Sequence, residues 1–243
     1  MLEFNKSSCC RVSGTILNWL RKKRVYRWRE LRRVTPVSRL FGFDRGRPID
    51  RHYIEGFLGL HVDDIHGRVL EIADNYYTAK FGGVRVTQGD ILNVVSSGTG
   101  TTLVGDLATG AGIPQCAFDC MILTQTLPFI YDINGAVIQI RNALRPGGIA
   151  LITLPGISQI SRYDMDRWGD YWRFTDASAK RIFGEVFGPE NVTVVTYGNV
   201  LAACAFLHGL AEHELAKTEL DYHDRDYQLI IGVRAVRAPE SEG

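Results

Sequence analysis

The chain has 243 residues, of which 45% are hydrophobic and 23% charged, and these are ordinary values for a soluble globular protein. This length accommodates one large α/β domain, or a domain with an added arm. The net charge of +1 conceals an asymmetry, because residues 1–51 carry 14 Lys/Arg against 4 Asp/Glu (net +10) and the remainder carries 14 against 23 (net −9). We therefore divide the chain into a basic arm (1–40), a domain (41–238) and a short tail (239–243).

Two classes of protein are excluded by simple counts. The longest apolar stretch, residues 199–211, has 13 residues and includes His208, which is too short to span a membrane. The five cysteines form neither a disulfide framework nor a CxxC zinc pattern, so no metal site is predicted. The early basic cluster follows the only apolar run near the start, unlike a signal peptide. A cytoplasmic location is the expectation.

The basic arm contains one candidate helix, over residues 11–33. Its apolar side chains fall roughly on one helical face, with Arg and Lys around the rest. Such a helix could lie on an anionic membrane surface or contact RNA phosphates. Packing against its own domain, or a frayed basic tail, explains the pattern equally well.

The domain begins with a predicted helix, in which Asp50 is a plausible N-cap residue. An apolar run at residues 69–72 then predicts a buried strand that contains Glu71. A second run, 84–87, ends at Asp90, nineteen residues beyond Glu71. This spacing is typical of nucleotide sites at the carboxyl ends of parallel strands. Two ordinary strands with solvated acids at their ends remain the alternative.

Strands and helices alternate through the rest of the domain. Predicted strands cover residues 101–107, 118–124, 149–154, 192–197 and 227–236, and predicted helices cover 132–144 and 176–187. This alternation of strands and helices predicts a parallel sheet that is covered by helices on both faces.

Several motifs in this order resemble the class I S-adenosylmethionine-dependent methyltransferases. They are VLEIADN (69–75), GD (89–90), GDL (105–107), FDCMILTQTL (118–127), LRPGGIALITLPG (144–156) and YWRFT (171–175). The resemblance implies a three-layer Rossmann-like fold, with a mostly parallel seven-stranded sheet and an antiparallel strand near the C-terminus. Two further runs, 43–58 and 156–175, resemble methyltransferase-domain proteins that are associated with glycosyltransferases and glycan biosynthesis.

The resemblance also implies S-adenosylmethionine as cofactor and suggests which residues bind it. Glu71 would order the first loop, Asp90 would hold the ribose and Asp106 would face the adenine. The remaining predicted cofactor residues lie after the first and fourth strands: Ala73, Asp74, Asn75 and Gln125. One departure is that the first loop lacks the glycines usual in the family, so side chains hold the cofactor, binding is weak, or catalysis is lost.

The predicted acceptor site is the polar and aromatic stretch 158–173, directly after the fifth strand. Its arginines and aromatic rings suit an anionic or sugar-containing acceptor: Arg162, Tyr163, Arg167, Trp172 and Arg173, with Tyr53 added from the helix before the first strand. Asp164, Asp166 and His208 are the candidate bases for a hydroxyl acceptor. Each of these side chains could equally serve a structural role. Residues 45–53 are expected to form part of a lid.

Three functional classes follow from these observations. The favoured one is a methyltransferase acting on the hydroxyl of a small or glycan-linked acceptor. The second is a non-catalytic module that partners a glycosyltransferase. The third, with nucleic acid as the less favoured partner, is an RNA methyltransferase that uses the basic arm.

Overall fold

The computed structural model describes residues 32–96 and 100–239. The helix predicted in the arm lies outside the described residues except for residues 32 and 33, which are not helical. Within the described ranges, no helix is both long and apolar enough to cross a membrane.

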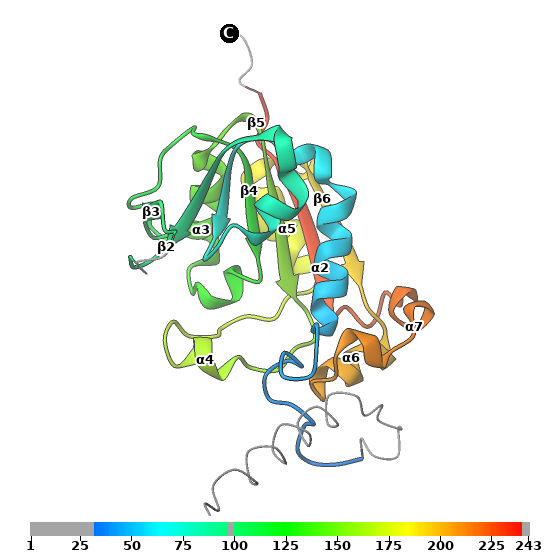
Figure 1. Ribbon diagram of the computed structural model, residues 1–243. Coiled ribbons are helices and arrows are strands. Elements are labelled where there is room, and N and C mark those ends of the chain that lie inside the picture. Colours follow the sequence, from blue (N-terminus) through cyan, green and yellow to red (C-terminus); the bar gives the residue numbers. More distant parts are fainter. Residues whose placement is uncertain (1–31, 97–99, 240–243) are drawn as a thin grey trace, which may run out of the picture.

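A seven-stranded sheet in the order β3-β2-β1-β4-β5-β7-β6 forms the centre of the molecule (Figure 1). Its strands are β1 (Gly67–Ile72), β2 (Val86–Asn93), β3 (Leu103–Val104), β4 (Phe118–Thr124), β5 (Leu144–Pro155), β6 (Val192–Tyr197) and β7 (Ile230–Val236). Neighbouring strands are parallel except for β7, which is antiparallel to both β5 and β6. The predicted mostly parallel sheet with an antiparallel strand near the C-terminus is confirmed.

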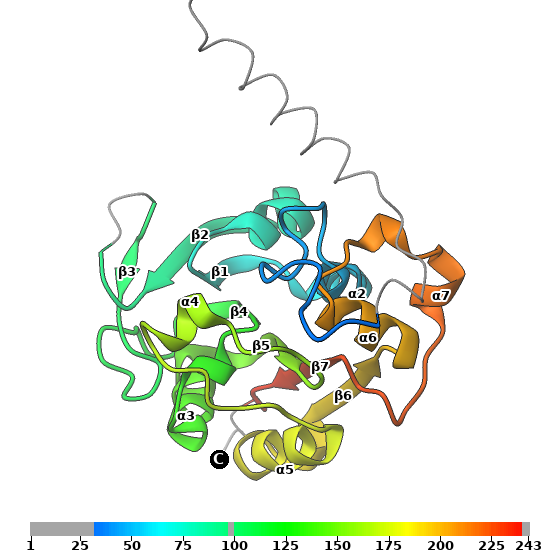
Figure 2. The ribbon, with the colours of Figure 1, turned by 90° about the horizontal axis from the view of Figure 1, so that it is seen from below.

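Helices cover both faces of this sheet, which confirms the predicted three layers (Figure 2). The helices α2 (Ile49–Leu60) and α6 (Val200–Leu207) pack on one face, and α3 (Ile133–Ala143) and α5 (Asp176–Phe187) on the other. Side chains of a strand alternate between faces. In β4, Met121 and Leu123 accordingly join the core under α3 and α5, whereas Cys120 and Ile122 join the core under α2 and α6.

The remaining helical segments are short. They are η2 (Val62–Asp64), a π-helical turn η3 (Thr78–Gly82), η4 (Gly83–Arg85), η5 (Leu127–Phe129), α4 (Arg162–Met165), η6 (Pro189–Asn191), η7 (Glu212–Glu214) and α7 (Lys217–Asp221). The connection from β1 to β2 thus holds η3 and η4 but no α-helix, in keeping with its short length.

Elements with strong local signals lie where they were predicted. The bounds of β4, α5 and β6 equal the predicted ranges. Helix α5 begins after Thr175, whose hydroxyl accepts the Ser178 N–H in a capping box, and ends at Gly188 with φ of 88°. Asp132 caps α3 by accepting the N–H of Gly135 at 2.9 Å.

The predicted end of the second strand is wrong. Strand β2 continues to Asn93, and Asp90 lies in its interior opposite Leu70 of β1. Ile91 and Leu92 extend the run because they are buried and pair with the last residues of β1. The third strand is shorter than predicted, with only Leu103 and Val104 in the sheet.

The start of α2 also differs from the prediction. Pro48 holds the N-cap position with an extended backbone, so the helix begins at Ile49. Asp50 is therefore a buried residue of the first turn, and no side chain caps this helix.

The segment 37–48 is attached to the chain that follows α6, and the two lie together below α2 (Figure 1). The N–H groups of Val37 and Ser38 donate to the His208 carbonyl at 2.8 and 3.0 Å, and Pro48 forms a β-bridge with Ala211. Together with α4, these segments surround the end of the sheet where β5 terminates (Figure 2).

Candidate active site

The turn after β1 is organised by the Glu71 carboxylate. This side chain is buried, and its two oxygens accept the backbone N–H groups of Tyr77 at 3.0 Å and Thr78 at 2.7 Å. Burial raises the pKa of Glu71, and the two N–H groups offset this only in part. Glu71 thus holds the turn through the backbone.

Ala73 adopts a left-handed backbone with φ of 72° immediately after the strand. Its N–H donates to the Leu92 carbonyl of β2 at 3.1 Å, which fixes the turn beside the sheet. Asp74 accepts the Tyr76 N–H at 2.9 Å and so forms a further local turn. A non-glycine residue therefore supplies the conformation that a glycine would normally provide here.

A cavity of about 460 Å³ lies beside this turn and is called the β1 cavity below. Its walls come from the end of β1, the following turn, the loop before α2 and the end of β4: Phe43, Gly46, Arg47, Pro48, Arg51, Glu55, Glu71, Ile72, Ala73, Asp74, Tyr76, Tyr77 and Thr124. Asn75, although predicted to bind the cofactor, does not line it and is exposed.

A second cavity, of about 650 Å³, lies over the ends of β4 and β5 and is called the β5 cavity. The side chains that line it include the charged residues Arg39, Asp50, Arg51, Arg162, Asp164, Asp170 and Arg173. Aromatic residues line it as well: Phe41, Phe43, Phe129, Tyr163 and Phe206. The two cavities share Phe43, Arg51 and Thr124, so they adjoin at the carboxyl end of β4.

The loop before α2 forms a wall between these cavities that is held in place by ion pairs. Arg45 donates from Nη2 to Glu214 Oε1 at 2.5 Å and from Nε to Oε2 at 2.9 Å, and both side chains are almost fully buried. Arg47 pairs with Glu55 and Glu212. This attachment favours a fixed wall over the predicted lid.

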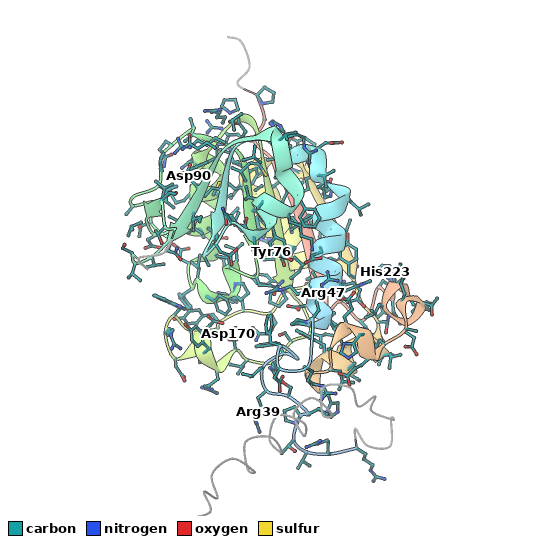
Figure 3. All side chains as sticks on the ribbon, in the orientation of Figure 1. Arg39, Arg47, Tyr76, Asp90, Asp170 and His223 are labelled. Atoms are coloured by element: carbon teal, nitrogen blue, oxygen red, sulfur yellow. The ribbon has the colours of Figure 1, made fainter. Side chains whose placement is uncertain are left out.

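The predicted ribose ligand, Asp90, lies away from both cavities. Its carboxylate accepts hydrogen bonds from Arg68 at 2.7 Å, Gln88 at 3.1 Å and Thr102 at 2.9 Å within the sheet. Figure 3 shows Asp90 on the upper part of the sheet, whereas Arg47, Asp170 and Arg39 lie toward its lower end. The last residue of β2 is instead Asn93, whose amide donates to Thr101 Oγ1 at 2.9 Å.

The other two predicted cofactor residues follow strands. Asp106 comes after β3, and its carboxylate accepts the Ala108 N–H at 2.8 Å and the Thr109 hydroxyl at 3.2 Å, which forms a tight turn. Gln125 follows β4 with φ of 53° and lines the β5 cavity. Its amide donates to Thr153 Oγ1 at 3.3 Å.

Of the three candidate bases, Asp164 lines the β5 cavity, whereas Asp166 and His208 line neither of the two cavities described. Asp164 accepts the Ser161 hydroxyl at 2.5 Å in α4. Asp166 has a 60% exposed side chain and lies 3.5 Å from Arg162. His208 ends α6, and its buried Nδ1 has no hydrogen-bond partner among the described residues. The structure therefore does not bring these three residues together.

The predicted acceptor residues separate into two groups. Arg162, Tyr163 and Arg173 line the β5 cavity, and Arg173 forms a bidentate pair with the buried Asp170 at 2.6 and 2.9 Å. Burial acts to raise the pKa of Asp170, but the Arg173 guanidinium and the Ser161 N–H lower it overall. This buried ion pair favours a structural role for Arg173.

The other group lies outside the β5 cavity. The Arg167 guanidinium stacks on Tyr163, 3.4 Å from the ring centroid. Trp172 donates to the Ile130 carbonyl at 3.2 Å. Tyr53 is buried in α2, donates to the Leu220 carbonyl at 2.9 Å and stacks on Tyr197. This buried position does not support the predicted role of Tyr53 in substrate binding.

Sequence reasoning missed four residues at the centre of the site: Arg39, Asp50 as a cavity residue, Arg51 and Thr124. Asp50 carried a signal, because it lies four residues before Ile54 and seven before Phe57 and so falls on the buried face of the helix. Arg39 and Thr124 carried none. The loop with Arg39 is placed by contacts with residues distant in the sequence, namely Gln159 and residues 208–214.

Comparison with protein families finds no matching family model, and no curated protein matches the sequence. Solved structures do match. The chain is 17% identical to N-methyltransferase NodS from Bradyrhizobium japonicum, with a TM-score of 0.51 over 87% of this chain and 96% of that one. It is 9% identical to a SAM-dependent methyltransferase from Archaeoglobus fulgidus, with a TM-score of 0.50 over 76% and 94%.

A third match is to phosphoethanolamine N-methyltransferase 2 from Haemonchus contortus, at 15% identity and a TM-score of 0.45. The match covers 72% of this chain and 49% of the Haemonchus protein, so this chain spans about half the length of that protein. The two matches with higher TM-scores establish the architecture: the described chain has the Rossmann-like α/β fold of solved class I methyltransferases.

Proposed function

We propose that the protein is an S-adenosylmethionine-dependent methyltransferase that methylates a hydroxyl group of a small anionic or glycan-linked acceptor. The observation that carries the proposal is the junction of the two cavities at Arg51 and Thr124, at the carboxyl end of β4. In open α/β sheets, ligands bind outside the carboxyl ends of the strands. Two adjoining cavities at that edge provide room for a donor and an acceptor.

The β1 cavity is the better candidate for the cofactor. Its volume falls within the range of about 300 to 1,000 Å³ that is typical of small-molecule sites. The Glu71-bound turn and the left-handed Ala73 bring the backbone close to this cavity without a bulky side chain in between. NodS, which shares the fold, was solved with S-adenosyl-l-homocysteine, and this supports the choice of cofactor.

We assign the ribose to Asn93 rather than Asp90. Asn93 ends β2 directly after Leu92, which pairs with Ile72 in the wall of the β1 cavity, whereas the carboxylate of Asp90 is already bonded inside the sheet. Asp106 remains the candidate for the adenine, and Asp74 and Gln125 remain candidates for the rest of the cofactor. Arg51 reaches both cavities and could pair with the carboxylate of the cofactor's amino acid part.

The β5 cavity is proposed as the acceptor site. Arg39 and Arg162 are exposed at its rim, where guanidinium groups recognise carboxylates and phosphates. Phe43, Phe129 and Tyr163 provide flat apolar surfaces for a ring or a sugar face. The cofactor supplies an activated methyl group, so these residues need mainly to hold the acceptor in line with it.

The partners and location remain proposals of the same kind. A glycosyltransferase partner, a membrane-surface contact of the basic arm and a cytoplasmic location agree with the sequence, and the described residues bear on none of them. An RNA methyltransferase would require RNA affinity that falls steeply with salt. A non-catalytic module would bind the cofactor without transferring methyl to any acceptor.

Calorimetric titration with S-adenosylmethionine tests the proposal directly. We expect saturable binding to the full chain, and at least about fivefold weaker binding after Asn93→Ala because a hydrogen bond of roughly 1 kcal/mol is lost. Glu71→Gln should weaken binding more, because the amide replaces one of the two accepting carboxylate oxygens with an NH2 group, which cannot accept the second N–H. Methyl transfer is then assayed with nucleotide sugars, oligosaccharides, hydroxylated carboxylates, neutral lipids and RNA.

Each measurement has an outcome that would contradict part of the proposal. No S-adenosylmethionine binding would refute the proposed function. Weakening by Asp90→Asn but not by Asn93→Ala would return the ribose to Asp90. Methylation of RNA or neutral lipids alone would refute the acceptor class.

A further inference from the structure

Asp50 lines the β5 cavity next to Arg51, the residue that reaches both cavities. Asp50 is only 9% exposed, and its Oδ1 is fully buried without a hydrogen-bond partner among the described residues. The ion pair with Arg51 is long, because Arg51 Nη1 lies 3.5 Å from Oδ2, beyond the usual hydrogen-bond range of about 2.7 to 3.2 Å. A buried carboxylate with such weak pairing is unfavourable unless a ligand or a proton compensates it.

The charged groups around Asp50 do not neutralise it. Arg51 and Arg47 act on it from the start of α2 and the preceding loop. The other charged residues that line the same cavity are Arg39, Arg162, Asp164 and the Asp170–Arg173 ion pair. Burial raises the pKa of Asp50, and the charges of Arg51 and Arg47, with nearby N–H groups, offset this only in part.

We propose that Asp50 is the carboxylate that faces the cofactor's sulfonium from the β5 cavity, beside the junction residue Arg51, and takes the acceptor's proton during transfer. This inference rests on the proposed function. In the step, the acceptor oxygen forms a bond to the methyl carbon, and the carbon–sulfur bond breaks with its electrons retained by sulfur. The hydroxyl proton passes to the Asp50 carboxylate. The products are a methyl ether, a neutral thioether and a neutral carboxyl group.

The charges in this step explain why a poorly paired acid occupies a buried position. Before transfer, the sulfonium and the carboxylate compensate each other inside the protein. Afterwards both are neutral, so no isolated charge remains in an environment where it would be costly. A raised pKa suits the proton acceptor, because its protonated form is favoured once the positive charge has gone.

Asp50 should favour S-adenosylmethionine over S-adenosylhomocysteine, since only the former carries a positive charge on sulfur. The two ligands share their amino, carboxyl and adenosine groups, so the titration of those groups cancels in the ratio of the two affinities. The sulfonium lowers the pKa of a nearby carboxyl, so the preference for S-adenosylmethionine should rise with pH through the titration of Asp50.

The experiment is calorimetric titration of both ligands against the full chain from about pH 5 to about pH 8, a window above the ordinary aspartate pKa of 3.8 because burial raises that of Asp50. At the upper end, Asp50→Asn should reduce the affinity ratio at least about tenfold. Toward lower pH, the difference between wild type and variant should narrow as Asp50 takes up a proton. Asp63→Asn, which removes an exposed acid in η2, is the matched control and should behave as wild type.

Equal affinity ratios in wild type and Asp50→Asn across the pH range would overturn the inference and leave the proposed function intact. Absence of S-adenosylmethionine binding to wild type would refute both. Circular dichroism checks that Asp50→Asn is folded, which is expected because the neutral amide avoids a buried charge. Should it not fold, the pH dependence of the wild-type ratio decides alone, and a ratio independent of pH refutes the inference.

Discussion

At residue 73 the backbone adopts a conformation that glycine normally supplies. Ala73 has φ of 72°, and its side chain is exposed, so its methyl group contributes little packing. A left-handed alanine costs roughly 1 to 2 kcal/mol, which the Glu71 hydrogen bonds to the following turn must offset. The glycine-poor first loop therefore departs from the family in composition while one of its residues retains a glycine-like conformation.

Ala73→Gly should relieve this strain and raise the free energy of unfolding by about 0.5 to 1 kcal/mol, after allowance for the larger entropy that glycine gives the unfolded chain. Urea denaturation measures the change. Ala79→Gly is the control, because this exposed residue lies in the helical turn η3 and should lose about 0.5 to 1 kcal/mol. A loss of stability in both variants would mean that residue 73 is not strained.

At the scale of elements, the wall between the cavities depends on two segments far apart in the chain. Segment 37–48 carries Arg45, and η7 carries Glu214, and their buried bidentate pair joins the two. Two glycines allow the close approach: a Cβ on Gly42 would lie 2.7 Å from the Leu210 carbonyl, and one on Gly209 would lie 2.3 Å from that of Ser38. The wall thus requires both segments at once.

Glu214→Ala should release this wall, because it removes the buried bidentate ion pair with Arg45, and breaking such a buried pair costs about 3 to 5 kcal/mol. We expect faster proteolytic cleavage within residues 37–48, followed by mass spectrometry. Glu185→Ala removes an acid from the exposed pair with Arg181 and should change neither cleavage nor stability measurably. Faster cleavage in wild type without S-adenosylmethionine than with it would instead support a mobile lid.

At the scale of the whole molecule, the α2 layer sits unusually close to the sheet at one point. Gly232 in β7 has no side chain, and a Cβ there would lie 2.5 Å from the Phe57 ring of α2. Phe57 is among the largest fully buried side chains. Its contact with Gly232 therefore packs α2, the helix that carries Asp50 and Arg51, directly on strand β7.

Gly232→Ala should therefore lower the free energy of unfolding by about 1 to 3 kcal/mol through overpacking. Gly56→Ala, one residue from Phe57 but open to solvent with no atom within 4 Å of the new Cβ, should raise it by up to about 1 kcal/mol. Thermal and urea unfolding of the two variants measure the contrast. Equal effects would show that the Gly232 contact relaxes without cost.

Local signals were sufficient for much of the sheet. The run 118–124 reads as a buried strand and forms β4, and the Thr175 cap with Gly188 beyond the last turn defines α5. The alternation of such elements also implies the parallel order, because a strand, a crossover and a further strand pack in essentially one hand. The antiparallel position of β7 came from the resemblance rather than from any local pattern.

The site depended on register and long-range contact, which the sequence does not display. Asp90 resembles a strand end in sequence, but pairing with β1 extends β2 to Asn93 and leaves Asp90 bonded inside the sheet. Asp50 resembles a helix cap, and only the packing of α2 over the end of β4 turns it into a poorly paired acid in a cavity. Composition and periodicity thus determined the layers, because burial alternates locally along each element. Tertiary structure decided which polar side chains meet, because that depends on strand register and on the contact of loop 37–48 with residues 208–214.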